Sequence, residues 1–320
     1  MASTHEYQAD PRNETIKIWI NGQLKPRAEA MVSVLDSGFM LGDGVWEGIR
    51  VHQGKLAFID QHLQRLYEGA AALRMDIGLT AAELTEAIHQ TLAVNDQTDD
   101  VHIRLMVTRG LRATPYQSPS VVVGEATVVI LPEFKAPKAE VLTRGLRLAS
   151  VSTRRGRPDV QDPKWNSHSK LNCITACIQA DEAGADEALM LDPQGFVATC
   201  NSTHFFIVVN PWGLDREQEV WTSTGDYCMP GITRSNVIAL CERNGIVVRE
   251  KNFSLTDVYG ASEAFVTGTF AGVAPVASVD GRAMGGVAAA LMGVDVGFER
   301  GPVTEQLQRW YVELIGESIS

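Results

Sequence analysis

Residues 162–188, DPKWNSHSKLNCITACIQADEAGADEA, form the most informative stretch of this 320-residue chain. Lys164 and Lys170 lie among Asn, Ser and His residues, immediately before a pattern typical of a helix. Its apolar residues recur on one face, and Gly184 lies where a left-handed helix end is expected; these residues are Leu171, Ile174, Cys177 and Ile178. A buried lysine between a strand and a helix can hold a carbonyl compound as a Schiff base. The alternative is a solvated surface lysine.

The composition indicates an ordinary globular protein. Hydrophobic residues make up 45% of the chain, and its length is enough for roughly two domains. The formal net charge of -11 argues against non-specific binding to nucleic acid or to an anionic membrane. Five cysteines without a CxxC pair predict neither a disulfide framework nor a metal site. With no apolar N-terminal segment and no membrane-length apolar run, we expect a cytoplasmic protein.

The first half of the chain combines hairpins with amphipathic helices. Strands are expected at residues 16–20, 23–24, 49–51, 56–59, 101–108 and 121–131. Asn21-Gly22 and Gln53-Gly54 are typical two-residue hairpin turns. Helices are expected at residues 62–73 and 80–93, and the second begins with a capping box formed by Thr80 and Glu83.

The second half interleaves strands and helices, although many connections are hairpins. This pattern favours a mixed α+β fold over a doubly wound sheet. We expect a disordered N-terminus at residues 1–14, a small α+β domain at 15–134 and a linker at 135–140, followed by a large domain at 141–320. The linker is predicted because PEFKAPKAE contains two prolines and lacks apolar periodicity.

Three separate segments are suited to binding one phosphate group. Arg65 is a planar cation on the first long helix. Pro230-Gly231-Ile232-Thr233 opens a helix, where backbone amides and a hydroxyl attract an anion. Gly268-Thr269-Phe270-Ala271-Gly272 is a glycine-flanked turn with a second hydroxyl. Each segment taken singly has a plain structural explanation, so the prediction depends on their combination and order.

Five motifs in order strengthen that combination: WEGIR (46–50), HLQRL (62–66), PGITR (230–234), TGTFAGVAPV (267–276) and GPVT (301–304). Together they resemble the fold-type IV enzymes that use pyridoxal 5'-phosphate (PLP). That family includes branched-chain and D-amino-acid aminotransferases, (R)-amine transaminases and aminodeoxychorismate lyase. The resemblance extends over roughly residues 16 to 315, and the motifs are specific as a set.

The resemblance implies a fold, a cofactor and a reaction. The fold would be a small α+β domain and a larger pseudo-barrel domain, assembled as a homodimer. Arg65, the amides of Ile232 and Thr233, and Thr269 would hold the PLP phosphate. The reaction would transfer an amino group between an amino acid (branched-chain-like) or an amine and a keto acid.

The chain departs from the family pattern at the lysine. Counted without gaps, the Schiff-base position falls at Asn166, which cannot form an imine. Lys170, four residues on, would lie near the reactive carbon in the resembling enzymes. Lys164 shares a strand face with residue 166 and is the alternative. A third possibility is a protein that binds phosphate or PLP without a Schiff base.

A second departure concerns the pyridine nitrogen of the cofactor. The family glutamate falls at Thr199, and Asn201 lies two residues further along the same expected strand. Both are neutral, whereas a carboxylate keeps the nitrogen protonated. Slower transamination is expected, or a different outcome such as the elimination catalysed by a lyase.

Substrate recognition is indicated by an aromatic residue and several arginines. Trp46 would narrow the pocket, and an arginine would bind a substrate carboxylate; the candidates are Arg50, Arg104, Arg109 and Arg112. The alternatives are that Trp46 belongs to the core and that Arg50 and Arg104 pair with acids of the small domain.

Overall fold

The computed structural model describes residues 9–210, 218–292 and 300–319, and the chain divides into two compact units. The N-terminal unit contains the described residues up to Ala136 and also Trp165–Lys170. The C-terminal unit contains Pro137–Lys164 and Leu171–Glu317. A six-residue segment from the middle of the chain therefore belongs to the N-terminal unit, which the sequence did not indicate.

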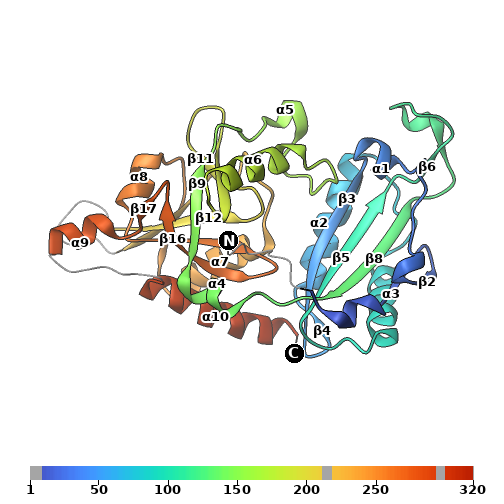
Figure 1. The fold of residues 1–320 in the computed structure, drawn as a ribbon, viewed down its shortest axis with the longest axis horizontal. Helices are drawn as coiled ribbons and strands as arrows, with labels where there is room; N and C mark the ends of the chain where they lie inside the picture. The colour runs from blue at the N-terminus through green and yellow to red at the C-terminus, as the bar shows by residue number, and fades with distance from the viewer. Residues whose placement is uncertain (1–8, 211–217, 293–299, 320) are drawn as a thin grey trace. The chain divides into compact units, whose positions relative to one another are not determined.

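The N-terminal unit is built on one antiparallel sheet with the strand order β2-β1-β8-β5-β3-β4 (Figure 1). Both predicted hairpin turns are confirmed, because Asn21, Gly22, Gln53 and Gly54 all have positive φ. The strands are β1 (Lys17–Ile20), β2 (Gln23–Pro26), β3 (Gly44–His52), β4 (Lys55–Leu56), β5 (Val101–Thr108) and β8 (Thr127–Phe134).

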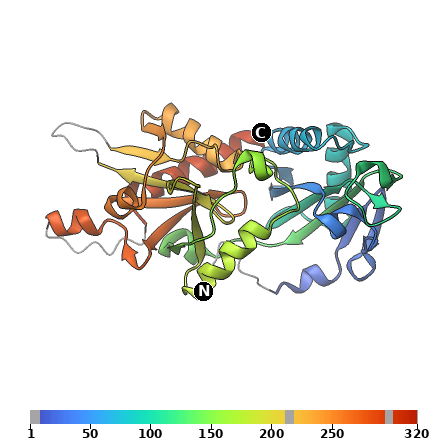
Figure 2. The same ribbon diagram turned by 90° about the horizontal axis from the view of Figure 1, so that it is seen from above.

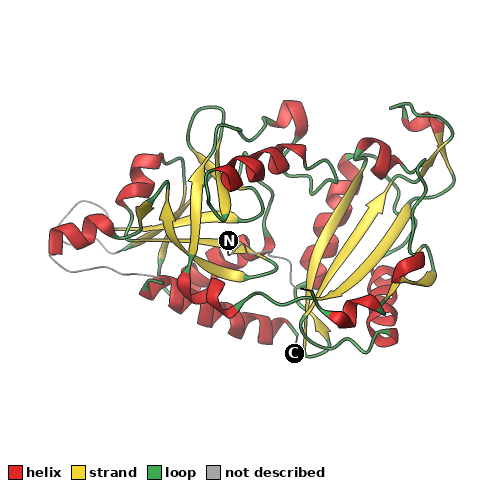
Figure 3. Ribbon diagram, in the orientation of Figure 1, coloured by secondary structure: helices red, strands yellow, loops and turns green. Residues whose placement is uncertain are grey.

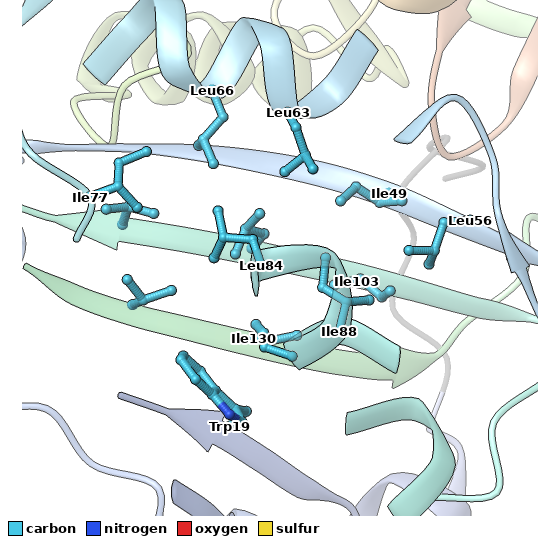
Figure 4. Packing of buried hydrophobic residues seen from close by; sticks show 14 of the residues in the cluster. Trp19, Ile49, Leu56, Leu63, Leu66, Ile77, Leu84, Ile88, Ile103 and Ile130 are labelled. Carbon is cyan, nitrogen blue, oxygen red and sulfur yellow. The ribbon is translucent and has the colours of Figure 1, made fainter. Parts of the chain in front are cut away.

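Two helices, α2 (Ile59–Ala72) and α3 (Ala81–Val94), supply the rest of the core of this unit. Figure 4 shows Leu63 and Leu66 of α2 above side chains of the sheet such as Ile49 and Ile103. The predicted capping box at Thr80 is present. One boundary was wrong, because residue 59 begins α2 and does not extend the strand at β4.

Side chains alternate along β3, so its two faces lie in different environments. Val45, Ile49 and Val51 are buried in the core cluster. Trp46 lies on the opposite face, and residue 47 is a carboxylate that points with the core side chains towards α2. One strand therefore contributes both to the core and to the candidate site.

Short elements complete the N-terminal unit. The expected strand at 121–131 is split, because Gly124 has a positive φ and separates β7 (Val122–Val123) from β8. Residues 1–8, part of the segment expected to be disordered, lie outside the described residues, and Asn13 donates a hydrogen bond to the Phe134 carbonyl. The other short elements are η1 (Pro11–Glu14), η2 (Arg27–Glu29), α1 (Ser37–Leu41), β6 (Leu111–Arg112) and η3 (Pro119–Val121).

The C-terminal unit is built on a mixed sheet with the order β11-β10-β9-β16-β15-β12-β13-β14, and β17 pairs with β16. Among these pairs, β9 with β10, β9 with β16, and β13 with β14 are parallel. The strands are β9 (Leu146–Ser150), β10 (Glu187–Leu191), β11 (Val197–Cys200), β12 (His204–Val209), β13 (Glu219–Thr222), β14 (Val247–Glu250), β15 (Glu263–Gly268), β16 (Gly272–Val279) and β17 (Arg282–Ala283).

Helices flank this mixed sheet (Figure 3). They are α4 (Ala139–Arg144), α5 (Pro158–Gln161), α6 (Leu171–Glu182), α7 (Ile232–Arg243), α8 (Leu255–Gly260), α9 (Gly286–Met292) and α10 (Pro302–Ser318). The strand that follows α6 is deeply buried, since every residue of β10 is buried. Gly184, just past α6, has the expected positive φ of 69°.

The apolar face predicted for α6 does not face the core. Leu171, Ile174 and Ile178 are 74%, 51% and 53% exposed. The helix instead buries Ala176 and Ala180, in a cluster with residues of β9 and β10, because small side chains allow a close approach to the strands.

The N-terminus of α10 is fixed to the sheet by a buried carboxylate. Glu263, the first residue of β15, is 6% exposed and accepts hydrogen bonds from the amides of Val303 (3.0 Å) and Thr304 (2.9 Å). It also accepts one from the Thr304 hydroxyl at 2.7 Å. A Cβ at Gly301 would lie 2.1 Å from the Glu263 carboxyl carbon, so only glycine fits there. The negative charge also suits the helix dipole.

We expect Glu263→Gln to lower the free energy of unfolding by about 2 kcal/mol, because an amide cannot replace a charged acceptor of three hydrogen bonds. Urea unfolding followed by circular dichroism measures the change. The matched control is Glu313→Gln, an exposed position on the same helix, where the change should stay within about 0.5 kcal/mol. Equal effects of the two substitutions would show that the helix end does not depend on Glu263.

Candidate functional site

Arg65 is held by a buried carboxylate of the N-terminal unit. Glu47 on β3 accepts hydrogen bonds from Arg65 Nε (2.8 Å) and Nη2 (2.6 Å), so the pair is bidentate. His62, one helical turn before Arg65 on α2, donates from Nδ1 to the same carboxylate at 2.7 Å. All three side chains are buried. The guanidinium therefore has a fixed orientation, which an anion-binding arginine requires.

The protonation states of this cluster follow from burial and charge. Burial acts to raise the pKa of Glu47, but Arg65 and His62 together outweigh it, and the pKa lies below its usual value. Burial lowers the pKa of His62 despite the neighbouring carboxylate, so the imidazole is neutral at pH 7. The cluster contains one carboxylate and one guanidinium, with a neutral imidazole as an additional donor.

The N-terminus of α7 is the first candidate anion-binding segment of the C-terminal unit. Gly231 precedes the helix and supplies no side-chain cap, and both Ile232 and Thr233 are buried. The first amides of a helix have no acceptor within it. His204 on β12 hydrogen-bonds through Nε2 to the Met229 carbonyl at 2.7 Å, and a Cβ at Gly231 would lie 2.3 Å from its ring. The geometry suits an anion at this helix end.

The turn between β15 and β16 is the second candidate anion-binding segment. Gly268 and Gly272 pair across the ladder, and Thr269 lies in the turn between them. Thr267, at the end of β15, is fully buried, and its hydroxyl has no hydrogen-bond partner among the described residues. A buried hydroxyl without a protein partner fits a site that receives a polar ligand. The residues present are therefore suited to a phosphate group.

The segment before α6 is an additional strand-like edge of the N-terminal sheet. The Trp46 amide donates to the Asn166 carbonyl at 2.9 Å, and the His168 amide donates to the Gly44 carbonyl at 2.9 Å. Val45 and Ser167 form an isolated antiparallel bridge. These contacts explain why Trp165–Lys170 belongs to the N-terminal unit although its sequence neighbours do not.

This segment places Lys170, and not Lys164, beside Trp46. Lys170 Nζ donates to Asn166 Oδ1 at 3.1 Å and lies 5.3 Å from the centre of the Trp46 ring. Asn166 Nδ2 donates to the Trp46 carbonyl at 2.5 Å. Lys164 is exposed and belongs to the other unit. Asn166, noticed in the sequence only as a missing lysine, therefore orients Lys170.

The candidate arginines fall into different environments. Arg104 stacks on Trp46, with Cζ 3.6 Å from the ring centre, and burial lowers its pKa. Arg109 binds Asp43 through Nε (2.8 Å) and Nη2 (3.0 Å), and Arg112 binds the same carboxylate at 2.8 Å. Arg50 donates to the Lys135 carbonyl at 2.5 Å. The structure therefore brings Arg104 together with Trp46 and Lys170, whereas Arg109 already has a carboxylate partner.

Thr199 and Asn201 both make local contacts within the C-terminal unit. The Thr199 hydroxyl donates to the Thr203 carbonyl at 2.8 Å, and Asn201 Oδ1 accepts from the Ala188 amide at 2.7 Å. The same corner contains Glu187, a buried carboxylate that accepts from the Thr203 hydroxyl at 2.6 Å. Sequence reasoning missed Glu187, and the only signal was an acid at the start of a buried strand.

The structure describes no metal site and no membrane-spanning helix in residues 9–210, 218–292 and 300–319. These residues contain no group of three or more His, Cys, Asp and Glu suited to a metal ion. The same part of the chain contains no helix that is both long and apolar enough to cross a membrane.

Each unit thus contains a candidate site of its own: two backbone segments suited to an anion in the C-terminal unit, and an oriented lysine in the N-terminal unit. The comparison with known families makes this specific. Residues 44–279 match the model of the class IV amino-transferases, so the chain belongs to that family.

Individual relatives agree with that assignment. Branched-chain-amino-acid aminotransferase-like protein 2 of Arabidopsis thaliana is 36% identical over 95% of this chain and 51% of its own length. This chain thus spans about half of that relative. The putative branched-chain-amino-acid aminotransferase of Methanocaldococcus jannaschii is 39% identical, over 83% of this chain and 89% of its own. The branched-chain aminotransferase of Thermobaculum terrenum, solved in its PLP form, superposes with a TM-score of 0.79, 26% identity and coverage of 96% and 95%.

The solved relative also establishes the fold. The mixed α/β architecture seen here is that of the branched-chain aminotransferases, which is the two-domain fold-type IV architecture expected from the motifs.

The Glu47 cluster leads to a pH-dependent prediction. We expect Glu47→Gln to lower the free energy of unfolding at pH 7 by about 3 kcal/mol, since it leaves Arg65 buried without a counter-charge. The folded-state pKa of Glu47 is depressed, so its contribution is complete above the unfolded pKa and is lost as pH falls through the folded value. The difference between the variant and the wild type should therefore narrow below about pH 4.

Urea unfolding at pH 7 and at pH 3.5 tests this expectation. Glu68→Gln, at an exposed position on the same helix, is the control and should change little at either pH. A difference between Glu47→Gln and the wild type that is independent of pH would contradict the assigned role.

Proposed function

We propose that this chain is a PLP-dependent aminotransferase that moves an amino group between an amino acid or amine and a keto acid. The observation that carries the proposal is the buried, side-chain-uncapped N-terminus of α7, with Gly231 forced by His204. The two curated relatives are named for branched-chain amino acids, and we infer an aliphatic amino-acid substrate from them. PLP, when bound, supplies an electron sink that stabilises negative charge at the substrate carbon.

Each unit would contribute its own groups to the cofactor. In the C-terminal unit, the amides of Ile232 and Thr233 and the hydroxyls of Thr233 and Thr269 would bind the phosphate. In the N-terminal unit, Arg65 would contribute a guanidinium that Glu47 holds in place. This division follows from the chemistry of a dianion, which needs several oriented donors.

We infer that Lys170 is the lysine that holds the cofactor covalently. Its hydrogen bond to Asn166 orients the amine, and Arg104 and Lys170 both lie over the Trp46 ring. After substrate binding, the free amine of Lys170 would move the proton at the substrate carbon. Arg104 is the arginine that we propose for the substrate carboxylate, since Arg109 and Arg112 share Asp43.

The pyridine nitrogen would meet neutral partners. Thr199 and Asn201 are the proposed neighbours, and both already make hydrogen bonds within the sheet corner. A neutral partner makes the cofactor a weaker electron sink, so we expect slow transamination. The three relatives described above all have aminotransferase names, and the lyase alternative has no comparable support.

Borohydride reduction tests the lysine assignment. Reduction of the purified protein with PLP should fix a pyridoxyl label on the peptide that contains Lys170, as mapped by mass spectrometry. Lys170→Ala should abolish the label, while Lys164→Ala, the matched control at an exposed position, should keep it. A label on Lys164 would show that Lys164, and not Lys170, holds the cofactor. PLP binding without any labelled lysine would identify a non-covalent PLP-binding protein.

We further propose a cytoplasmic homodimer. Several large apolar side chains of the N-terminal unit are exposed, which is typical of an interface; they include Met31, Val34 and Phe39. Sedimentation equilibrium should give about twice the chain mass of 34.8 kDa. Phe39→Asp should shift the mass towards one chain, while Asp substituted at Val160, an exposed apolar residue of the C-terminal unit, serves as the control. A monomer at micromolar concentration would contradict this proposal.

A further inference from the structure

The last helix, α10, contacts both anion-binding segments of the C-terminal unit through one tyrosine. Tyr311 is 5% exposed, and its hydroxyl lies 3.2 Å from the Thr233 hydroxyl at the start of α7. Its ring packs on Gly272, where a Cβ would lie 3.1 Å from two ring atoms. Gly272 closes the turn that carries Thr269. The Tyr311 side chain therefore contacts Thr233 in the first segment and Gly272 at the end of the second.

Other contacts fix α10 in this position. Gln308 donates from Nε2 to the Val273 carbonyl on β16 and to the Leu142 carbonyl on α4, both at 2.9 Å. Glu263 holds the first turn of the helix, as described above. In Figures 1 and 2 the dark red α10 lies beside the orange α7, in agreement with the Tyr311–Thr233 contact. Tyr311 thus lies on a helix that Glu263 and Gln308 attach to β15, β16 and α4.

The two hydroxyls form a chain with a defined direction once an anion is present. Burial raises the pKa of Tyr311 to about 12, so the phenol keeps its proton at neutral pH. A threonine hydroxyl has one proton to donate and can also accept. A phosphate can only accept from Thr233, which then has its oxygen available for a proton from Tyr311. Hydrogen bonds arranged in such a chain strengthen one another.

We propose that Tyr311 is a positioning residue of the phosphate seat. It donates to Thr233, directs the Thr233 proton towards the phosphate, and supports the Gly272 turn with its ring. This inference rests on the proposed function, because it assumes that Thr233 binds the cofactor phosphate. It assigns to α10 a role in binding specificity in addition to its role in folding.

Comparison of PLP with pyridoxal, which lacks the phosphate, isolates the contribution of Tyr311 to phosphate binding. Tyr311→Phe removes only the hydroxyl and keeps the ring on Gly272. We expect it to weaken PLP binding about five- to tenfold, the size of one lost hydrogen bond between neutral groups, and to leave the dissociation constant of pyridoxal unchanged. The inhibition constant of inorganic phosphate against PLP binding should also rise in the variant. Titration of the apo protein by fluorescence or calorimetry measures all three.

A matched control separates this effect from a general loss of stability. Tyr259 is a half-buried tyrosine on α8 of the same unit, and its hydroxyl donates to Asp280 at 2.7 Å. Tyr259→Phe deletes the same atom away from the anion-binding residues and should leave the ratio of PLP to pyridoxal affinity unchanged. Thermal unfolding of both variants shows whether either has lost its fold.

A double-mutant cycle tests the route through Thr233. Once Thr233→Val is present, adding Tyr311→Phe should cause no further loss of PLP affinity. 4-Aminophenylalanine at position 311 restores a donor and should recover part of the wild-type ratio, which keeps the test valid if the phenylalanine variant folds poorly. An unchanged ratio in Tyr311→Phe would overturn the inference. Failure of the wild type to bind PLP at all would instead contradict the proposed function.

Discussion

The central physical constraint in this structure is that a buried helix N-terminus needs acceptors for its backbone amides. The helix α10 meets it through a side chain of β15, because the carboxylate of Glu263 accepts hydrogen bonds from the amides of Val303 and Thr304. At the start of α7, Ile232 and Thr233 are buried and Gly231 supplies no side-chain cap. Since unsatisfied buried donors cost free energy, this helix start suits the anion that we propose for it.

The residues around the start of α7 leave no room for a side-chain cap there. His204 occupies the space next to Gly231, so a larger residue cannot enter and provide a cap. Tyr311 contacts the next hydroxyl along, and Gly272 leaves room for its ring. Each of these residues has an ordinary packing role, and their common effect is to hold two backbone segments in position. Preorganised donors of this kind bind an anion without the cost of ordering them at the moment of binding.

The N-terminal unit contains several buried or half-buried charged side chains. Glu47 pairs with Arg65 and His62, and Asp43 pairs with Arg109 and Arg112. Buried ionised groups are tolerated when they are paired and hydrogen-bonded. Arg104 and Lys170 are instead arranged around the Trp46 ring. Arg104 and Lys170 are the residues of this group that we propose for the substrate and the cofactor, together with Arg65, which Glu47 orients.

The sequence by itself determined the local structure and the family. Turn residues with positive φ and the capping box at Thr80 are local signals, and the structure confirms them. The five motifs identified the fold family because they are contiguous segments whose order survives in the chain. The positions suited to a phosphate were also visible, since amides at a helix start and a glycine-flanked turn are properties of short segments.

Only the tertiary structure decided which side chains meet. The face of α6 that carries Leu171, Ile174 and Ile178 is exposed, because Ala176 and Ala180 let the helix approach the sheet more closely. The choice between Lys164 and Lys170 could not be made from spacing, because residues 165–170 join the edge of a distant strand and their neighbours do not. Glu47 and Tyr311 gave no local signal, since their partners are far away in sequence. Glu187 gave only the signal of an acid at the start of a buried strand. Contacts of this kind depend on the three-dimensional path of the backbone, which a short pattern of residues does not contain.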